Sequence, residues 1–326
     1  MVAIIILNWN GWQDTLACLD SLYKQQGSDF FIVVVDNNSQ DQSVKEISEW
    51  LLINNKSYQN LTEGQLISKP ISKYDCILYS LDENYGFAKG NNLAMELIKK
   101  VDVDYYLLLN NDTVATELFL ATLIDFSQHH KEYRALTPQI RYHKEPDIIW
   151  NCGGHLFAGF RKYHYAKYHK STLPQKSHIP ISFITGCALF ITKELHTVDK
   201  LFTEKFFFGE EDFEFSLRQR HNRVKMACVL DSILYHKVSA TQTKDTQLGR
   251  IFIHYLNRFI NVRDHYCRFY VYFWVKVNLI YINRVVLRHL PKNKRVEFIK
   301  LLALEYSRKT TVDRDTFFHY SKLFSK

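Results

Sequence analysis

The sequence predicts an α/β protein: a mixed, mostly parallel sheet flanked by helices, followed by a C-terminal helical extension. Two observations predict this class. Short apolar runs alternate with amphipathic segments from the first residues onward, which is the pattern of βαβ units. Each of the first four runs also passes directly into polar residues, as strands do at the ligand-binding edge of a parallel sheet.

The first half of the chain contains four predicted strands, with helices between them. Their apolar runs are long enough for strands buried on both faces. The strands span residues 2–8, 30–35, 76–81 and 105–109. The polar residues at their ends are Asn8, Asp36, Asn84 and Asp112. The polar stretch 53–73 is predicted to be a surface loop.

The second half alternates less regularly. A helix is predicted over 119–130, and residues 153–165, rich in glycine and tyrosine, are predicted to form a loop. That loop could recognise an acceptor, or it could have no specific function. Further strands are predicted at 136–142, 148–152, 224–230 and 233–235, and a helix at 248–262. Residues 181–191 are apolar but interrupted by Thr185-Gly186-Cys187.

The length of 326 residues predicts about two domains. We place a catalytic domain at 1–245, with a nucleotide-binding half 1–113 and an acceptor half 114–245, and a basic helical region at 246–326. Six cysteines without a C-x-x-C pair argue against a disulfide framework or a zinc knuckle and indicate a reducing compartment. The apolar N-terminus is too short for a signal peptide, so we expect a cytoplasmic protein.

The net charge of +8 is unevenly distributed. From Arg250 onward the chain has 16 basic and 5 acidic residues, so this last quarter carries all of the excess positive charge. Such asymmetry predicts an acidic surface as partner, and without a reader motif we do not expect nucleic acid. The basic, apolar segment 284–295 could lie on an anionic membrane surface, or it could be the solvated face of a packed helical subdomain.

The four polar strand ends predict a shared ligand site. Strand ends of a parallel sheet meet at one edge, so these side chains should line one crevice. The chain has neither G-x-G-x-x-G after the first strand nor G-x-x-x-x-G-K-[ST], which disfavours dinucleotide and P-loop sites. Asp112 could hold a cation, and Gly86–Gly90 with Lys89 could approach an anion. As an alternative, Asn110-Asn111-Asp112 could be a turn that caps a helix starting near Thr113.

The segment Phe206–Arg218 carries the strongest catalytic signal. Three aromatic residues run directly into Glu210, Glu211 and Asp212 at the predicted start of a helix. An acidic first turn is also ordinary helix-dipole chemistry. A carboxylate beside an apolar wall, however, gains the proton affinity that a general base needs. Spacing alone does not separate the three acids, and the acid and base at 214 and 218 are expected to form a structural pair.

Taken in this order, the motifs resemble family 2 glycosyltransferases with the GT-A fold. The resemblance is closest to the bacterial rhamnosyltransferase-like branch that builds cell-surface polysaccharides such as lipopolysaccharide and capsule. The motifs are Ile4–Asn10, Val35–Ser39, Asn84–Asn92, Leu109–Asp112, Thr185–Ile191 and Phe206–Arg218, within residues 1–241. One departure is the metal motif, which reads Asn-Asn-Asp instead of Asp-x-Asp and leaves Asp112 as its only carboxylate.

The resemblance implies an inverting, metal-dependent glycosyltransferase. It would move a sugar such as rhamnose from a dTDP- or UDP-linked donor to a glycan or lipid-linked oligosaccharide acceptor. A lipid-linked acceptor would place the protein on the cytoplasmic face of the bacterial inner membrane. The resemblance assigns the base to Asp212, supported by Glu211, and a Mg²⁺ or Mn²⁺ ion to Asp112. His236 could be a second metal ligand or a core histidine.

The remaining implied site residues fall into three groups. Nucleotide-sugar binding is implied for Asn8, Trp9, Asn10, Asp36, Asn38, Asn84, Gly86, Lys89, Asn110 and Asn111. Acceptor binding is expected of Gly186, Cys187 and Glu210, although Cys187 is not expected to be a nucleophile. Closure over the diphosphate is expected of Lys237, Ser239 and Thr241.

Two other functions are open on sequence alone. A nucleotidyltransferase should carry a glycine-rich, basic segment just after the first strand, where this chain has Asn8-Trp9-Asn10-Gly11. A non-catalytic sugar-nucleotide-binding subunit of a polysaccharide assembly complex would not need the adjacent carboxylates at 210–212.

Overall fold

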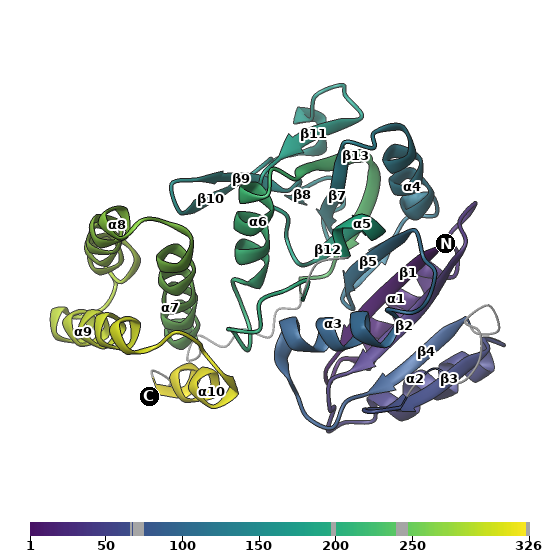
Figure 1. Ribbon diagram of the computed structural model, residues 1–326, viewed down its shortest axis with the longest axis horizontal. Coiled ribbons are helices and arrows are strands. Elements are labelled where there is room, and N and C mark those ends of the chain that lie inside the picture. Colours follow the sequence, from purple (N-terminus) through teal and green to yellow (C-terminus); the bar gives the residue numbers. More distant parts are fainter. Residues whose placement is uncertain (66, 68–74, 197–199, 239–246, 324–326) are drawn as a thin grey trace.

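The computed structural model describes residues 1–65, 67, 75–196, 200–238 and 247–323 (Figure 1). Within these ranges, one large sheet has the strand order β11-β13-β7-β12-β5-β1-β2-β4-β3. Helices flank the sheet, and four further helices gather beyond its second half, at the left of Figure 1. The predicted segments Ser239 and Thr241 lie outside the described residues, as does the domain boundary predicted at 245.

The part of the sheet built from the first five strands is wholly parallel. Its strands are β1 (Val2–Asn8), β2 (Phe30–Asp36), β3 (Tyr58–Thr62), β4 (Cys76–Ser80) and β5 (Tyr105–Asn110). All four predicted strands are confirmed. The prediction that 53–73 is only a loop is wrong, because β3 pairs with β4 along its whole length. The edge position explains the error: β3 is held by backbone hydrogen bonds to one neighbour and buries little besides Leu61, so its sequence stays polar.

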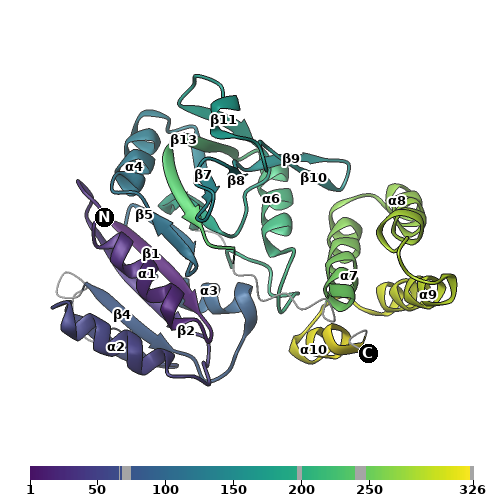
Figure 2. The ribbon, with the colours of Figure 1, turned by 180° about the vertical axis from the view of Figure 1, so that it is seen from behind.

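Side chains alternate between the two faces of this sheet, as the pleat requires. Ala3 and Ile5 of β1 enter one core, and Ile4 and Ile6 enter the other. Helix α3 (Gly86–Leu97) covers the first face. Helices α1 (Trp12–Leu22), α2 (Ser43–Ile53) and α4 (Phe119–His129) cover the second, as Figure 2 shows from behind.

The second half of the sheet is mixed. Its strands are β6 (Thr113–Ala115), β7 (Tyr133–Tyr142), β8 (Ile149–Asn151), β11 (His178–Ile181), β12 (Ala188–Thr192) and β13 (Lys225–His236). Strand β12 runs antiparallel to β5, and β6 runs antiparallel to β13. Thr113 therefore begins a strand and not a helix. The two strands predicted at 224–230 and 233–235 are one strand, whose pairing with β7 shifts register between Val229 and Ile233.

The loop predicted at 153–165 is a hairpin. Strands β9 (Gly154–Phe157) and β10 (Phe160–Tyr163) pair antiparallel, apart from the main sheet. Their side chains alternate between buried Leu156 and exposed Phe157, so the hairpin has one face on the protein and one in solvent.

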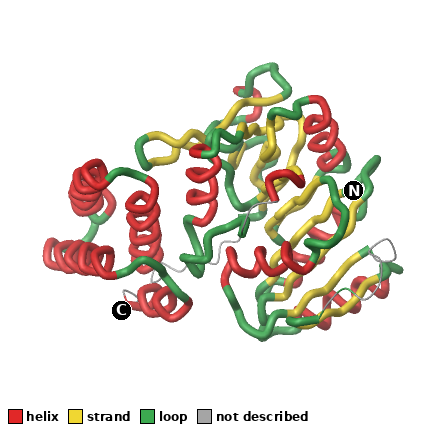
Figure 3. Tube along the Cα trace, viewed as in Figure 1, coloured by secondary structure: helices red, strands yellow, loops and turns green. Residues whose placement is uncertain are grey.

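The C-terminal helices share a core with helix α6 (Glu211–His221) (Figure 3). They are α7 (Gln247–His265), α8 (Arg268–Tyr281), the π-helical turn Ile282–Val286, α9 (Lys292–Arg308) and α10 (Arg314–Leu323). Phe213 of α6 packs in one cluster with Phe252 and Leu256 of α7. Segment 284–295 is not one helix, since it spans the π turn and the start of α9. Every helix that the structure describes is too short or too polar to cross a bilayer.

Candidate active site

Asn8 and Asp36 meet at the carboxyl edge of the sheet. They are register partners at the ends of β1 and β2, and Asn8 Nδ2 donates a hydrogen bond of 2.9 Å to Asp36 Oδ1. Asn8 Oδ1 accepts from the Thr15 hydroxyl at 2.9 Å, and Asp36 Oδ2 accepts from the Ser39 amide at 3.0 Å. Both side chains are buried, so the structure uses them to brace the two loops that leave these strands.

Asn37 connects the end of β2 with the start of α3. Its Nδ2 donates to Asn84 Oδ1 at 3.0 Å and to the Gly86 carbonyl at 3.1 Å, and its Oδ1 accepts from the Tyr85 amide at 3.0 Å. Around this bridge, Asn10 Oδ1 accepts from the Gln40 amide at 2.8 Å, Asn38 donates to the Asp82 carbonyl, and Trp9 is exposed.

Gly86 brings the first half of the chain against the acidic segment. It has a left-handed backbone, with φ of 78°, and an added Cβ would lie 1.9 Å from the Phe207 carbonyl oxygen. The next amide, of Phe87, donates to that same oxygen at 3.1 Å. Any side chain at Gly86 would therefore separate the two segments. Lys89, the predicted anion ligand, lies with its Nζ 3.6 Å from the ring centroid of Tyr85.

Asp112 and His236 form the candidate metal centre. They follow β5 and end β13, and His236 Nε2 lies 3.1 Å from Asp112 Oδ1. The His236 ring packs edge-on against Trp150, with centroids 4.5 Å apart. Burial alone would lower the pKa of His236, but the Cys187 sulfur and the Asp112 carboxylate outweigh it and raise the pKa to about 10. His236 is thus a charged partner of Asp112 at neutral pH.

Asp112 and His236 fit a cation that takes most of its ligands from water and from the substrate. Among the described residues, no group of three or more His, Cys, Asp and Glu side chains converges. One carboxylate still suits Mg²⁺, which is held by one or two carboxylates together with water and substrate phosphates. His236 would ligate only after losing its proton. The neighbouring Asn111 donates to Thr15 Oγ1 at 3.0 Å, and Asn110 donates its amide to the Cys187 carbonyl at 2.9 Å.

Glu210 is a buried anion held by two arginines and a histidine. Its Oε1 lies 3.3 Å from Arg161 Nη2 and 2.9 Å from His254 Nδ1, and its Oε2 accepts from Arg258 Nε. Burial by itself would raise its pKa, but Arg161, Arg258 and His254 hold it well below the usual range for a glutamate. The side chain is only 1% exposed. It therefore offers no surface to an acceptor in this conformation, and the acceptor role remains a prediction.

Helix α7 holds the turn that precedes α6. Asn257 Nδ2 donates to the carbonyls of Phe208 and Gly209, at 3.1 and 2.9 Å. Asn261 Nδ2 donates to the Glu210 carbonyl at 3.0 Å. With His254 and Arg258, these residues form one helix face. Their contacts support Glu210 in a left-handed conformation, with φ of 73°, which a side-chain-bearing residue adopts only when its surroundings enforce it.

Glu211 and Asp212 lie in different environments. Asp212 is 19% exposed, and its carboxylate lies 3.4 Å from Arg161 Nη1 and 3.4 Å from the Gly186 amide. Burial raises the pKa of Asp212, and Arg161 opposes that rise. Glu211 is buried, and burial and the charge of Asp212 raise its pKa to about 8. At neutral pH Glu211 therefore keeps its proton, and Asp212 is the accessible carboxylate that can accept one.

The segment before β12 lies between the two centres. Gly186 donates to Asp212, and its α-carbon faces the ring of Phe87, which an added Cβ would approach to 3.3 Å. The next residue, Cys187, is buried beside His236. The structure thus joins the predicted base, acceptor and metal residues through Gly186 and Cys187.

Other predicted residues of this region form ion pairs. Lys237 lies with Nζ 2.7 Å from Asp14 Oδ1. The structural pair predicted at i and i+4 is confirmed, since Arg218 Nε lies 3.1 Å from Glu214 Oε1.

Sequence reasoning missed Arg161 as a partner of the acids and missed the polar face of α7. Asn257, Arg258 and Asn261 look like solvated residues in a one-dimensional pattern. The usable signal was their position in an otherwise apolar helix: they lie among Phe252, Leu256, Phe259 and Ile260, all of which are buried.

Known proteins resemble this chain in sequence. The profile described as glycosyl transferase family 2 matches residues 3–197. The teichoic acid poly(glycerol phosphate) polymerase of Staphylococcus epidermidis is 28% identical over 113 residues, which are 34% of this chain and 12% of that protein. The chain therefore corresponds to only a small part of this relative.

Solved glycosyltransferases share the fold. The structure of GalNAc-T7 with UDP, GalNAc and Mn²⁺ has a TM-score of 0.61 at 15% identity, over 98% of this chain and 55% of the other. The mannosyltransferase PcManGT of Pyrobaculum calidifontis, in complex with GDP-Man and Mn²⁺, has a TM-score of 0.55 at 13% identity, over 94% and 75%. S. aureus TarS has a TM-score of 0.50 at 15% identity, over 87% and 43%. These likenesses confirm the predicted GT-A fold.

Replacing Arg258 should destabilise the protein through Glu210. The variant Arg258→Met leaves a buried carboxylate short of one charge partner, which costs about 3 kcal/mol of unfolding free energy. Urea denaturation measures this loss. Arg250→Met, on an exposed position of the same helix, should change stability by less than about 0.5 kcal/mol. Adding Glu210→Gln to Arg258→Met should recover part of the loss, and equal stability of the two arginine variants would refute the proposed dependence.

Glu211 should make stability fall as pH rises. Its folded pKa lies above its unfolded value, so between about pH 4.5 and 8 the unfolded state binds fewer protons, and stability declines with rising pH. Glu211→Gln removes this decline. Relative to the wild type, its free energy of unfolding should therefore rise by up to about 1.4 kcal/mol per pH unit. Chemical denaturation at pH 5, 6.5 and 8 measures the difference.

Glu214→Gln is a control variant, because the contribution of Glu214 to stability changes with pH in the opposite direction. Burial raises the pKa of Glu214, but His265 and Arg218 outweigh it and lower the pKa, so the wild-type carboxylate stabilises the fold above its unfolded pKa and less at acid pH. A pH-independent difference between Glu211→Gln and the wild type would show that Glu211 titrates normally.

Proposed function

The chain belongs to glycosyl transferase family 2, and we propose from that premise that it transfers a sugar from a nucleoside-diphosphate sugar to a glycan or lipid-linked acceptor, with inversion. One observation carries the proposal. Asp212 is the accessible carboxylate of an otherwise buried acidic cluster, and the Gly186–Cys187 segment links it to Asp112 and His236. A base for the acceptor and a cation site for the donor thus lie on adjoining segments.

In the proposed reaction Asp212 removes the proton from an acceptor hydroxyl as that oxygen attacks the anomeric carbon. The attack comes from the face opposite the departing diphosphate, so one displacement inverts the configuration. Unlike a retaining glycosidase, this route needs one base and no covalent glycosyl-enzyme. Arg161 opposes the rise that burial causes in the pKa of Asp212, and Glu211, with its pKa raised to about 8, adds little second charge beside it.

The donor that we propose is a dTDP- or UDP-linked sugar, rhamnose for example. It would lie along the carboxyl edge of β1, β2, β4 and β5, where Trp9, Asn84 and Asn111 follow the strand ends. Asp112 and His236 would hold a Mg²⁺ or Mn²⁺ ion, which supplies positive charge to the departing diphosphate. The GalNAc-T7 and PcManGT structures, of the same fold, contain Mn²⁺ with a nucleotide or nucleotide sugar.

The product that we propose is a bacterial cell-surface polymer. The teichoic acid polymerase relative supports this class, and lipopolysaccharide or capsule are the alternatives within it. Lipid-linked acceptors of such polymers would place the enzyme on the cytoplasmic face of the inner membrane. The two rival functions, nucleotidyl transfer and non-catalytic binding, leave the cluster at Asp212 without a role.

Asp212→Asn should abolish transfer while preserving donor binding. Asparagine cannot accept the proton, so turnover should fall by about 10²–10⁴-fold. A panel of sugar nucleotides is first tested for thermal stabilisation of the protein in Mn²⁺, which identifies the donor. That donor should then raise the melting temperature of the wild type and of the variant equally. Glu211→Gln, its neighbour, should retain most turnover at neutral pH because Glu211 is already protonated. Wild-type-like turnover of Asp212→Asn would overturn the assignment of the base.

Asp112→Asn should weaken the cation site. Removing its carboxylate should raise the Mn²⁺ concentration for half-saturation by about 10–100-fold, the range that lost metal-site contacts typically cost. Titration calorimetry of Mn²⁺ into protein saturated with nucleoside diphosphate measures this directly, without turnover. His236→Gln should weaken binding in the same direction, whereas Asp20→Asn, on the exposed face of α1, should leave it unchanged. Unaltered Mn²⁺ binding in Asp112→Asn would exclude this centre.

A further inference from the structure

One face of α8 is exposed although it is apolar and aromatic. Between residues 269 and 281 its side chains recur every three or four positions and so form a single stripe. Their exposed fractions lie between 48% and 76%. They are Phe269, Tyr272, Phe273, Val277, Ile280 and Tyr281. A contiguous stripe of six exposed apolar and aromatic side chains on a folded protein marks a place of interaction.

The opposite face of α8 is firmly anchored. Val271, Trp274 and Val275 are buried in the core shared with α7, and Asn278 donates a hydrogen bond of 2.8 Å to the Trp274 carbonyl. The exposed stripe is therefore the outer side of a well-packed helix. It is not apolar surface left over from incomplete packing.

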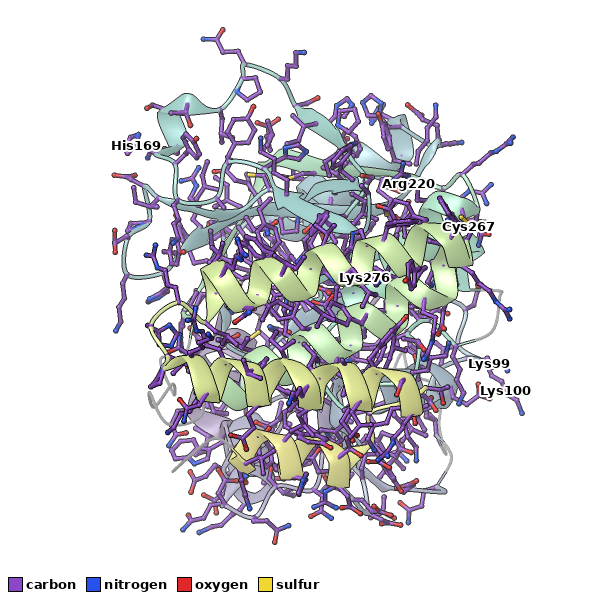
Figure 4. All side chains as sticks on the ribbon, turned by 90° about the vertical axis from the view of Figure 1, so that its left-hand side faces the viewer. Lys99, Lys100, His169, Arg220, Cys267 and Lys276 are labelled. Atoms are coloured by element: carbon purple, nitrogen blue, oxygen red, sulfur yellow. The ribbon has the colours of Figure 1, made fainter. Side chains whose placement is uncertain are left out.

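The charge around the stripe has one sign. Residues 265–296 contain no aspartate or glutamate. In the same range lie seven basic residues, Arg268, Lys276, Arg284, Arg288, Lys292, Lys294 and Arg295. Figure 4 looks onto this end of the molecule, where α8 and α9 lie in front and Lys276 projects from the outer surface. The basic character reaches beyond the segment 284–295 that the sequence indicated.

A cavity of about 430 Å³ opens beside the stripe. Three basic residues, Arg263, Arg268 and Lys276, line it together with Tyr272 and Tyr306. Such a cavity places positive charge beside aromatic surface. This is the combination that a lipid phosphate at the boundary of headgroups and acyl chains would meet.

We propose that the outer face of α8 docks onto an anionic lipid bilayer, with the aromatic stripe in the headgroup–acyl boundary and the basic residues on lipid phosphates. Apolar side chains that alternate with basic ones are the signature of helices that lie in this plane. A second copy of the chain is a poorer occupant, because pairing two copies through α8 would bring together two segments that each carry seven basic and no acidic residues.

The hairpin connects this face with the acids. Trp274 Nε1 of α8 donates to the Ala158 carbonyl at 2.8 Å, and the Phe160 ring lies 5.2 Å from the Trp274 ring. The next hairpin residue, Arg161, contacts both Glu210 and Asp212. Figure 1 shows the hairpin reaching toward α8. The inference rests on the proposed function only in one respect: a lipid-linked acceptor held in that bilayer would approach Asp212 along the hairpin.

Vesicle co-sedimentation of the full chain tests the proposal without donor or metal. The protein should sediment with vesicles of phosphatidylcholine containing 30% phosphatidylglycerol, about tenfold more than with phosphatidylcholine alone, because each basic residue near such a surface contributes about 1 kcal/mol. Phe269→Ser/Phe273→Ser/Ile280→Ser and, separately, Lys276→Glu/Arg284→Glu should each reduce binding at least about tenfold.

Matched controls separate the α8 face from general stickiness. Leu52→Ser/Ile53→Ser/Leu118→Ser changes side chains that are 59–78% exposed, on α2 and at the start of α4, and should bind like the wild type. Lys99→Glu/Lys100→Glu, also exposed, should do the same. All variants should keep donor hydrolysis in solution, so a failure of the glycosyltransferase proposal would appear there and not in sedimentation. Three results would each overturn the proposal. They are wild-type binding that does not depend on phosphatidylglycerol, an equal loss of binding in the variant at Leu52, Ile53 and Leu118, and a wild-type dimer that dissociates in the variant at Phe269, Phe273 and Ile280.

Discussion

The buried charge of Glu210 is the constraint on which the site depends. A carboxylate taken out of water persists as an anion only if cations and hydrogen bonds replace its hydration. Here Arg161 comes from the hairpin, and His254 and Arg258 come from α7, so one side chain joins three parts of the chain. The left-handed turn at 209–210 is held by the same helix. Helix α7 is thus a structural part of the acidic site.

A second set of contacts connects that turn to the sheet. The β1 and β2 ends are joined by Asn8 and Asp36, and Asn37 carries the connection to Gly86. From Gly86 and Phe87 it passes to the Phe207 carbonyl, three residues before Glu210. Buried amides with both ends hydrogen-bonded permit few alternative arrangements. The carboxyl edge and the acids, more than a hundred positions apart in sequence, are therefore held in one geometry.

The local sequence pattern predicted the buried strands, but it missed the strand held by backbone pairing and the polar side chains paired with other groups. Strands β1, β2, β4 and β5 were predictable because strands covered on both faces must be apolar, and the acidic helix start was predictable because aromatic residues precede it. Strand β3 was missed since an edge strand stabilised by backbone pairing needs few apolar side chains. Asn257, Arg258 and Asn261 were missed because a polar residue carries no mark in sequence of whether its partner is water or Glu210. The resemblance to a family supplied roles for Asp112 and Asp212 that spacing left open.

Arg161 gives neighbouring carboxylates different chemistry. Glu211 and Asp212 are adjacent at a helix start, and burial raises the pKa of both, but the Arg161 guanidinium beside Asp212 opposes the rise there. Pairs of acids whose surroundings separate their proton affinities are a common device for assigning a single base. Because Arg161 also holds Glu210, movement of the hairpin would alter both the buried anion and the base. The hairpin in turn packs on Trp274 of α8. The hairpin therefore connects the outer helix α8 with the carboxylate of Asp212, whose proton affinity depends on Arg161.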